Sequence, residues 1–261
     1  MGFFGKLFEK KVCDICGGEI GLLGNRKLED GNMCKECAKK LSPWFDERRH
    51  STIAQINDQL QYREENKARV AAFRTTRTFG EVYDLHLDED QQQLMVVRTN
   101  KIAEENPDVV DFSQVTGCEL DIDESRTEEM REDKDGNRVS YNPPRYNYDY
   151  DFYIVIRVNH PWFDDMRFKL NRSSVEIGNQ IARVGYSASM ANPGQRSMEY
   201  RRYEQMGQEI REAILNARQT ARDNMAAAAA PKAAITCPWC GATTTPDASG
   251  CCEYCGGAVN G

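Results

Sequence analysis

The segment RYNYDYDFYIVIRVN, at residues 145–159, is the one around which the rest of the chain is organised. Every second residue from position 146 to position 158 is aromatic or aliphatic: Tyr146, Tyr148, Tyr150, Phe152, Ile154, Ile156 and Val158. The intervening positions are polar or charged, interrupted only by Tyr153 and Val155. This period of two predicts a long β-strand with one face in a core. The chain therefore has a β core near its middle.

Shorter alternating segments on both sides of this strand predict further strands of the same domain. Residues 116–122 place Cys118, Leu120 and Ile122 on one face, so Cys118 is expected in the core and not as a metal ligand or nucleophile. The other strand candidates are residues 79–87, residues 93–98 and the segment around Met166, Phe168 and Leu170.

Two helices are predicted around the strands. Residues 46–70 carry Ile53, Ile56 and Leu60 at helical spacing and predict a connecting helix. A helix over about 195–224 presents an apolar face that consists of Tyr203, Met206, Ile210, Ala213, Ile214 and Ala217.

The acidic, polar segment 123–144 predicts a mobile loop. Its DKDGN motif imitates the start of a calcium-binding loop, but Arg138 and Pro144 occupy the positions of the required Gly and Glu. We therefore expect no calcium site, and a hairpin turn at residues 135–137.

Eight of the ten cysteines form four C-x-x-C pairs, and the first two pairs lie seventeen residues apart. A C-x-x-C turn directs two thiolates to one point, and two such turns complete the tetrahedral S₄ shell that Zn²⁺ prefers. The pattern continues with a short hairpin and a helix that begins at the second pair. We predict a structural zinc site with the ligands Cys13, Cys16, Cys34 and Cys37.

The segment CDICGGEIGLLGNRKLEDGNMCKECAKKLSPWF resembles an N-terminal, treble-clef-like zinc-binding domain of unknown function found in bacterial proteins. The resemblance covers about the first 45 residues and implies metal binding without a known catalytic activity. The pattern of strands followed by one helix over residues 72–224 resembles a pleckstrin-homology-like domain. An unrelated small β-sandwich or α+β sheet is the alternative for the same pattern.

The C-terminal cysteines follow an alanine-rich tether and occur in CPWCG and CEYCGG. These motifs resemble the knuckles of rubredoxin-type zinc ribbons. We predict a second structural zinc site with the ligands Cys237, Cys240, Cys252 and Cys255, and we expect Cys251 to be spare because Cys252 gives the C-x-x-C-G repeat. So short a ribbon owes its fold to the metal.

The predicted fold class is α+β: a small zinc module, a central and mostly antiparallel β domain closed by a helix, and a tethered zinc ribbon. The predicted divisions are residues 1–45, 46–71, 72–224, 225–235 and 236–261.

Composition limits the function. The net charge of -7 argues against a dedicated nucleic-acid binder. The cysteine pairs and the missing signal-peptide pattern indicate the reducing cytoplasm. The sequence contains no phosphate-binding loop and no nucleophile elbow around its three histidines, so we predict no catalytic residue.

We predict a non-enzymatic adaptor or scaffold whose partners are proteins, with self-association as a further expectation. Residues 1–11, MGFFGKLFEKK, have Phe4, Leu7 and Phe8 at helical spacing and suggest peripheral contact with a membrane surface or a partner groove. The alternative interpretation is that these aromatics cap the zinc module. The alternative function is a nucleic-acid-binding or ribosome-associated zinc-ribbon protein.

Overall fold

The computed structural model describes residues 11–181, 193–229, 234–247 and 249–259. The chain divides into two compact units, Met1–Arg218 and Gln219–Gly261. The predicted α+β class is confirmed, because the described residues combine antiparallel sheets, a C-terminal helix and two groups of four cysteines. Residues 1–10 of the predicted amphipathic segment lie outside the described residues.

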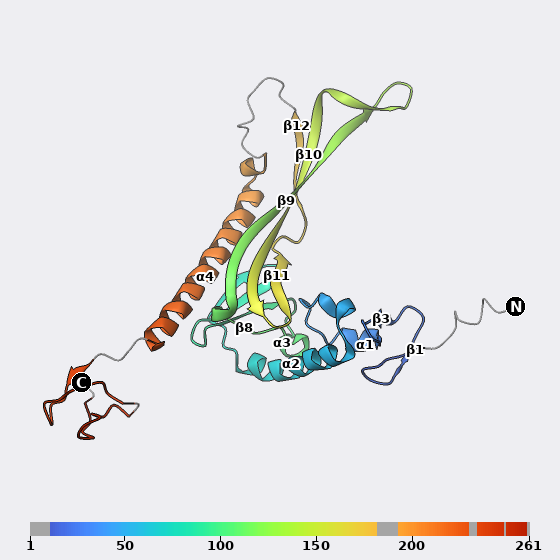
Figure 1. The fold of residues 1–261 in the computed structure, drawn as a ribbon. Coiled ribbons are helices and arrows are strands. Elements are labelled where there is room, and N and C mark those ends of the chain that lie inside the picture. Colours follow the sequence, from blue (N-terminus) through green and yellow to red (C-terminus); the bar gives the residue numbers. More distant parts are fainter. Residues whose placement is uncertain (1–10, 182–192, 230–233, 248, 260–261) are drawn as a thin grey trace. The chain divides into compact units, whose positions relative to one another are not determined.

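Strand β10 (Arg138–His160) is the centre of the first unit. One edge pairs along most of its length with β9 (Val115–Glu132). The other edge pairs with β11 (Phe163–Lys169) near its end and with β12 (Val175–Ile181) near its middle. Figure 1 shows the long β9–β10 hairpin that results.

The alternation in β10 is confirmed by burial. Its buried face consists of Tyr150, Phe152, Ile154, Ile156 and Val158, whereas Arg157 and Asn159 are exposed. Tyr146 and Tyr148 are half-buried, because this face of the strand is less covered toward the hairpin end.

The loop predicted for residues 123–144 is wrong. These residues form the outer parts of β9 and β10, which meet at a turn where Asp133 Oδ1 accepts the N–H groups of Asp135 and Asn137, both at 2.9 Å. The expected hairpin turn is therefore confirmed. Aromatic rings and arginines pair across the outer parts of β9 and β10. For example, the guanidinium of Arg126 lies 4.5 Å from the ring centre of Tyr146. Such pairs stabilise strands whose side chains are too exposed to be stabilised by burial alone.

A second sheet has the order β5–β6–β7–β8, with β5 at Arg77–Gly80, β6 at Asp84–Asp88, β7 at Gln93–Val97 and β8 at Val110–Asp111. The single strand expected at residues 79–87 is thus two strands. Gly80 makes the break: its φ is +116°, and a Cβ there would lie 1.9 Å from the carbonyl oxygen of Tyr83. Helix α3 (Ile102–Glu105) and a 3-10 turn at Phe112–Gln114 lie on either side of β8. The pleckstrin-homology-like arrangement stays a prediction.

Helix α4 (Met198–Ala229) packs on the first sheet. The rings of Tyr200 and Tyr203 lie 5.0 and 5.7 Å from that of Phe152, measured between centres. The predicted apolar face is confirmed at its buried positions Tyr203, Ile210, Ala213 and Ile214, while Met206 and Ala217 are half-buried. The helix continues into the alanine-rich tether because alanine has the highest helix propensity.

The N-terminal module consists of short strands β1 (Lys11–Val12), β2 (Glu19–Ile20), β3 (Asn25–Lys27) and β4 (Asn32–Cys34), followed by α1 (Lys35–Ala38). After a 3-10 turn at Glu47–His50 comes α2 (Ile53–Ala72), later than the predicted start at 46 because Thr52 and Gln55 form its capping box. Ile56 is fully buried in the same apolar cluster as Leu28 and Met33, so α2 completes the core of the module.

A buried polar network joins this module and α2 to the second sheet. Asp108 has no exposed surface and accepts hydrogen bonds from Arg63 Nη1 at 2.7 Å, Ser42 Oγ at 2.8 Å and Tyr62 Oη at 3.0 Å. Beside it, Asn66 Nδ2 donates to Asn106 Oδ1 at 2.9 Å. Each of these buried polar groups has a hydrogen-bond partner, and such a network fixes how the N-terminal module and α2 pack against the second sheet.

The second unit contains the end of α4 and a small module with strands β13 (Ile235–Thr236) and β14 (Thr243–Thr244). Its core consists of Cys237, Cys252 and Val259, with Ile235 against them. Among the described helices of the whole chain, none is long and apolar enough to cross a membrane.

Candidate metal centres

The N-terminal group contains Cys13, Cys16, Cys34 and Cys37, whose Sγ atoms all lie within 4.8 Å of one another. The first two come from the turn after β1, and the last two from the end of β4 and from α1. Cys34 is the N-cap of α1, and its Sγ accepts the N–H of Cys37 at 3.3 Å. The start of α1 therefore supplies a backbone N–H to the sulfur of Cys34.

Three of the four C-x-x-C turns share one backbone arrangement. At the first, Cys13 N–H donates to Gly18 O at 2.9 Å and Gly17 N–H donates to Cys13 O at 2.8 Å. The same two bonds recur at the turns that begin with Cys237 and Cys252. Each turn ends on a glycine with φ near +70°, at Gly17, Gly241 and Gly256. A residue with a side chain would be strained at this backbone angle, so the glycine belongs to the motif.

The C-terminal group brings together Cys237, Cys240, Cys252 and Cys255, again within 4.8 Å. Cys251 lies next to this group in sequence but outside it in space. It forms an isolated bridge with Ala258, and its N–H donates to Asp247 Oδ1 at 2.9 Å.

The distances between thiols fit a tetrahedral ion. Sγ–Sγ separations are 3.8 Å for Cys16–Cys34, 3.6 Å for Cys237–Cys255 and 3.8 Å for Cys240–Cys252. Zn–S bonds of about 2.3 Å place two thiolates of a tetrahedron about 3.8 Å apart. A disulfide would require about 2.05 Å, and all ten cysteines are free. Both groups could therefore hold a metal ion, and the donor set is consistent with zinc.

The electrostatics of the thiols also favour a cation. Burial raises the pKa of Cys13, but the backbone N–H groups of Cys34, Cys16 and Ile15 outweigh this effect and lower it to about 6. Burial and the neighbouring thiols raise the pKa of Cys37. In the second group, burial raises the pKa of Cys252, but the backbone N–H groups of Tyr254 and Cys255 outweigh this effect and lower it to about 6. The backbone N–H of Gly257 lowers the pKa of Cys255, but the neighbouring thiols and burial outweigh this effect and raise the pKa to about 12. Thiolates so close repel one another, and a bound cation removes the conflict.

Cys118 belongs to neither group. It is 4% exposed on the core face of β9, as predicted, and burial raises the pKa of its thiol to about 12.

Sequence reasoning missed the exposed apolar side chains on both modules. Leu22 and Leu23 are 85% and 94% exposed in the turn before β3. Trp239 and Tyr254 are 73% and 71% exposed, each inside a C-terminal C-x-x-C turn. The sequence could have predicted this exposure. A large apolar residue inside a tight turn, between glycines or between metal ligands, cannot reach the core of a small module.

A comparison with known protein families matches residues 11–59 to a family described as "Domain of unknown function (DUF4428)". The match includes the first group of four cysteines and the first part of α2. No curated protein matches the chain. No solved structure matches it.

Proposed function

We propose that this protein is a non-enzymatic zinc-binding adaptor that makes contacts with protein partners through its two metal modules. The observation that carries this proposal is the pair of exposed large apolar side chains on each module. Leu22 and Leu23 project from the first, and Trp239 and Tyr254 project from the second. Aromatic and aliphatic side chains held outside a core are typical of interaction sites, where a few residues supply most of the binding energy.

The donor sets support a structural role for the metals. Four thiolates complete a tetrahedral shell and leave no position for a substrate or a reactive water. The described core of the second unit is small: it consists of Cys237, Cys252 and Val259, with Ile235 against them. So small a core contributes little to stability, and metal binding would therefore supply most of the folding free energy of this module. The zinc ions would thus hold the exposed residues in fixed positions.

Elemental analysis tests the metal assignment. We expect two zinc ions per chain after purification without chelator. Cys252→Ser should reduce this to one, whereas Cys251→Ser should keep both. Fewer than two ions in the unchanged chain, or metal loss on changing Cys251, would contradict the assignment.

A binding experiment with the full zinc-loaded chain tests the adaptor role. Partners captured from cells are identified and purified. Their affinities are then measured for the unchanged chain and for two double variants. One variant carries Leu22→Asp and Leu23→Asp, and the other carries Trp239→Ala and Tyr254→Ala. We expect at least one variant to lose a partner while retaining both zinc ions.

Met198→Asp is the matched control, because Met198 is 81% exposed and lies on α4, outside both modules. Full affinity in both module variants would contradict the proposal. Captured nucleic acid with a steep salt dependence would favour the alternative function. Membrane contact through residues 1–11 stays a prediction, tested by flotation with anionic liposomes.

A further inference from the structure

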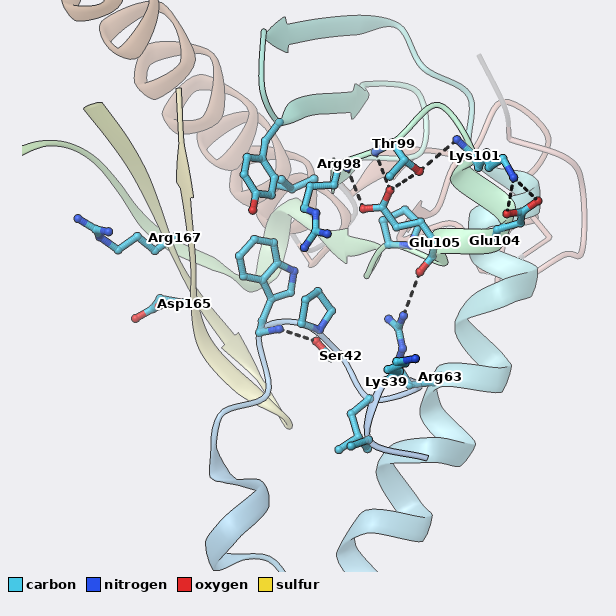
Figure 2. Close-up of a pocket in the computed structure, with 17 residues that line it drawn as sticks. Lys39, Ser42, Arg63, Arg98, Thr99, Lys101, Glu104, Glu105, Asp165 and Arg167 are labelled. Atoms are coloured by element: carbon cyan, nitrogen blue, oxygen red, sulfur yellow. Dashed lines mark hydrogen bonds and ion pairs between the residues drawn. The ribbon is translucent and has the colours of Figure 1, made fainter. Parts of the chain in front are cut away.

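A cavity of about 800 Å³ lies where the N-terminal module meets the second sheet. Its walls come from α1 and the segment after it, from α2, from the turn before β6, from the end of β7 with the following α3, and from β11. Such a volume is within the range of sites for small organic ligands. Figure 2 shows the lining residues around the open centre.

The wall formed by the segment after α1 carries the apolar residues Leu41, Pro43 and Trp44, and Tyr83 before β6 and Val96 in β7 also line the cavity. The indole N–H of Trp44 is buried and has no acceptor in the part of the chain that the structure describes. A buried donor without an acceptor lowers the stability of the fold. A ligand with a hydrogen-bond acceptor at this point would remove that cost.

The charged side chains around the cavity are mostly satisfied. Arg63 pairs with Asp108, Lys101 pairs with Glu104, and Arg167 pairs with Asp121 and Asp123. The carboxylate of Glu105 accepts the N–H groups of Arg98 and Thr99, both at 2.8 Å. Figure 2 shows Asp165 and Arg167 leaving β11 on the side away from Arg98.

Arg98 and Asp165 are the exceptions, because neither side chain forms an ion pair or a hydrogen bond among the described residues. Arg98 is exposed, and Figure 2 shows its guanidinium turned toward the loop that carries Ser42, whereas Asp165 points away. The lining contains five cationic side chains, and four of them, Lys39, Arg63, Lys101 and Arg167, form ion pairs with carboxylates. Among the described residues, Arg98 is therefore the one cation of the lining that no carboxylate neutralises, and apolar side chains line the same cavity.

We propose that this cavity binds a carboxylate attached to a flat apolar group, most simply a phenyl ring. The carboxylate binds the guanidinium of Arg98, which offers two parallel N–H donors. The ring packs against Trp44 and Pro43. The ligand is either a free organic acid or an acidic residue beside an aromatic one in a peptide. The inference goes beyond the adaptor role and does not depend on it.

The test uses the full zinc-loaded chain labelled with ¹⁵N, because its three tryptophans give separate indole N–H signals. Trp44→Phe assigns the signal of Trp44. Hydrocinnamate is the free-acid probe, and acetyl-Ala-Phe-Glu-Ala-amide is the peptide probe. Hydrocinnamamide and the corresponding glutamine peptide are their neutral controls. We expect one acid to shift the Trp44 signal saturably and its neutral control to bind at least tenfold more weakly, and the tighter acid identifies the source.

Variants locate the contact. Arg98→Gln should weaken the acid at least tenfold, and Arg98→Lys should weaken it less. Arg138→Gln is the matched control, because it removes the same charge from the exposed start of β10. Equal binding of acid and neutral probes, equal affinity in Arg98→Gln and the unchanged chain, or no shift of the Trp44 signal with either acid would overturn the proposal.

Discussion

At the scale of single residues, burial separates the two cysteines that bind no predicted metal. Cys118 is 4% exposed and its pKa is raised to about 12, so its thiol is protonated and covered at neutral pH. Cys251 is half-buried and lies outside the C-terminal group. We expect iodoacetamide at about pH 8 to label Cys251 and leave Cys118 unlabelled in the zinc-loaded protein, as measured by peptide mass spectrometry. Faster labelling of Cys118 would mean that the sheet opens there.

His160 is expected to make the stability of the folded protein depend on pH. Burial lowers its pKa, with smaller opposing effects of Asp108 and Asp111 and a supporting effect of Arg69. The neutral ring accepts the N–H of Trp162 at Nδ1 and stacks on Phe163, with ring centres 4.1 Å apart. The unfolded chain therefore binds the proton more readily, so the stability contributed by the neutral ring is present above the ordinary pKa of about 6.5 and is lost as the pH falls below it.

Urea unfolding at several values between about pH 7.5 and 5.5 measures this effect. The unchanged protein should lose stability as the pH falls, and His160→Asn should lose less. His50→Asn is the control, since His50 is exposed. Equal pH dependence in all three proteins would show that His160 does not contribute.

At the scale of elements, α4 depends on a close approach to β9. A Cβ at Gly207 would lie 2.4 Å from Leu120 Cδ1. Replacing a helical glycine by alanine stabilises an unhindered helix by about 1 kcal/mol. We expect Gly207→Ala to give this gain in a Leu120→Ala background and to give less, or a loss, in the unchanged protein, as measured by urea unfolding. The same gain in both backgrounds would mean that Leu120 moves aside without cost.

At the scale of the whole molecule, the Asp108 network holds the N-terminal module against the second sheet. Arg63 and Asp108 side chains are 7% and 0% exposed. Removing one partner of a buried ion pair leaves the other charge without compensation, at a cost of about 3–5 kcal/mol. Asp108→Ala should therefore lower the free energy of unfolding by about this amount, measured at a fixed zinc concentration because metal binding adds to stability.

Glu119→Ala is the comparison for this prediction. The pair between Glu119 and Arg157 has side chains 59% and 54% exposed, and such pairs contribute little to stability because water screens their charges. A similar loss in both variants would show that the Asp108 network is no stronger than a surface ion pair.

Features that depend on neighbours along the chain follow from the amino-acid sequence. The C-x-x-C-G turns need only local spacing and a glycine with positive φ, so spacing alone is enough to group the eight cysteines into two sites. The alternation in β10 identifies its buried face, because side chains of a strand point to opposite sides in turn. The apolar face of α4 follows from helical periodicity in the same way.

Features that depend on residues far apart in the chain come from the packing of its elements. Residues 123–144 form strands because their partners lie across the hairpin, although their polarity predicts a loop. Asp108 is buried because Ser42, Tyr62 and Arg63 meet it from two other segments. The cavity beside Arg98 exists because segments far apart in the sequence, from α1 to β11, pack around it. Periodicity and spacing describe which face of an element is apolar, but the packing of elements decides which charged side chains are paired and which stay without a partner.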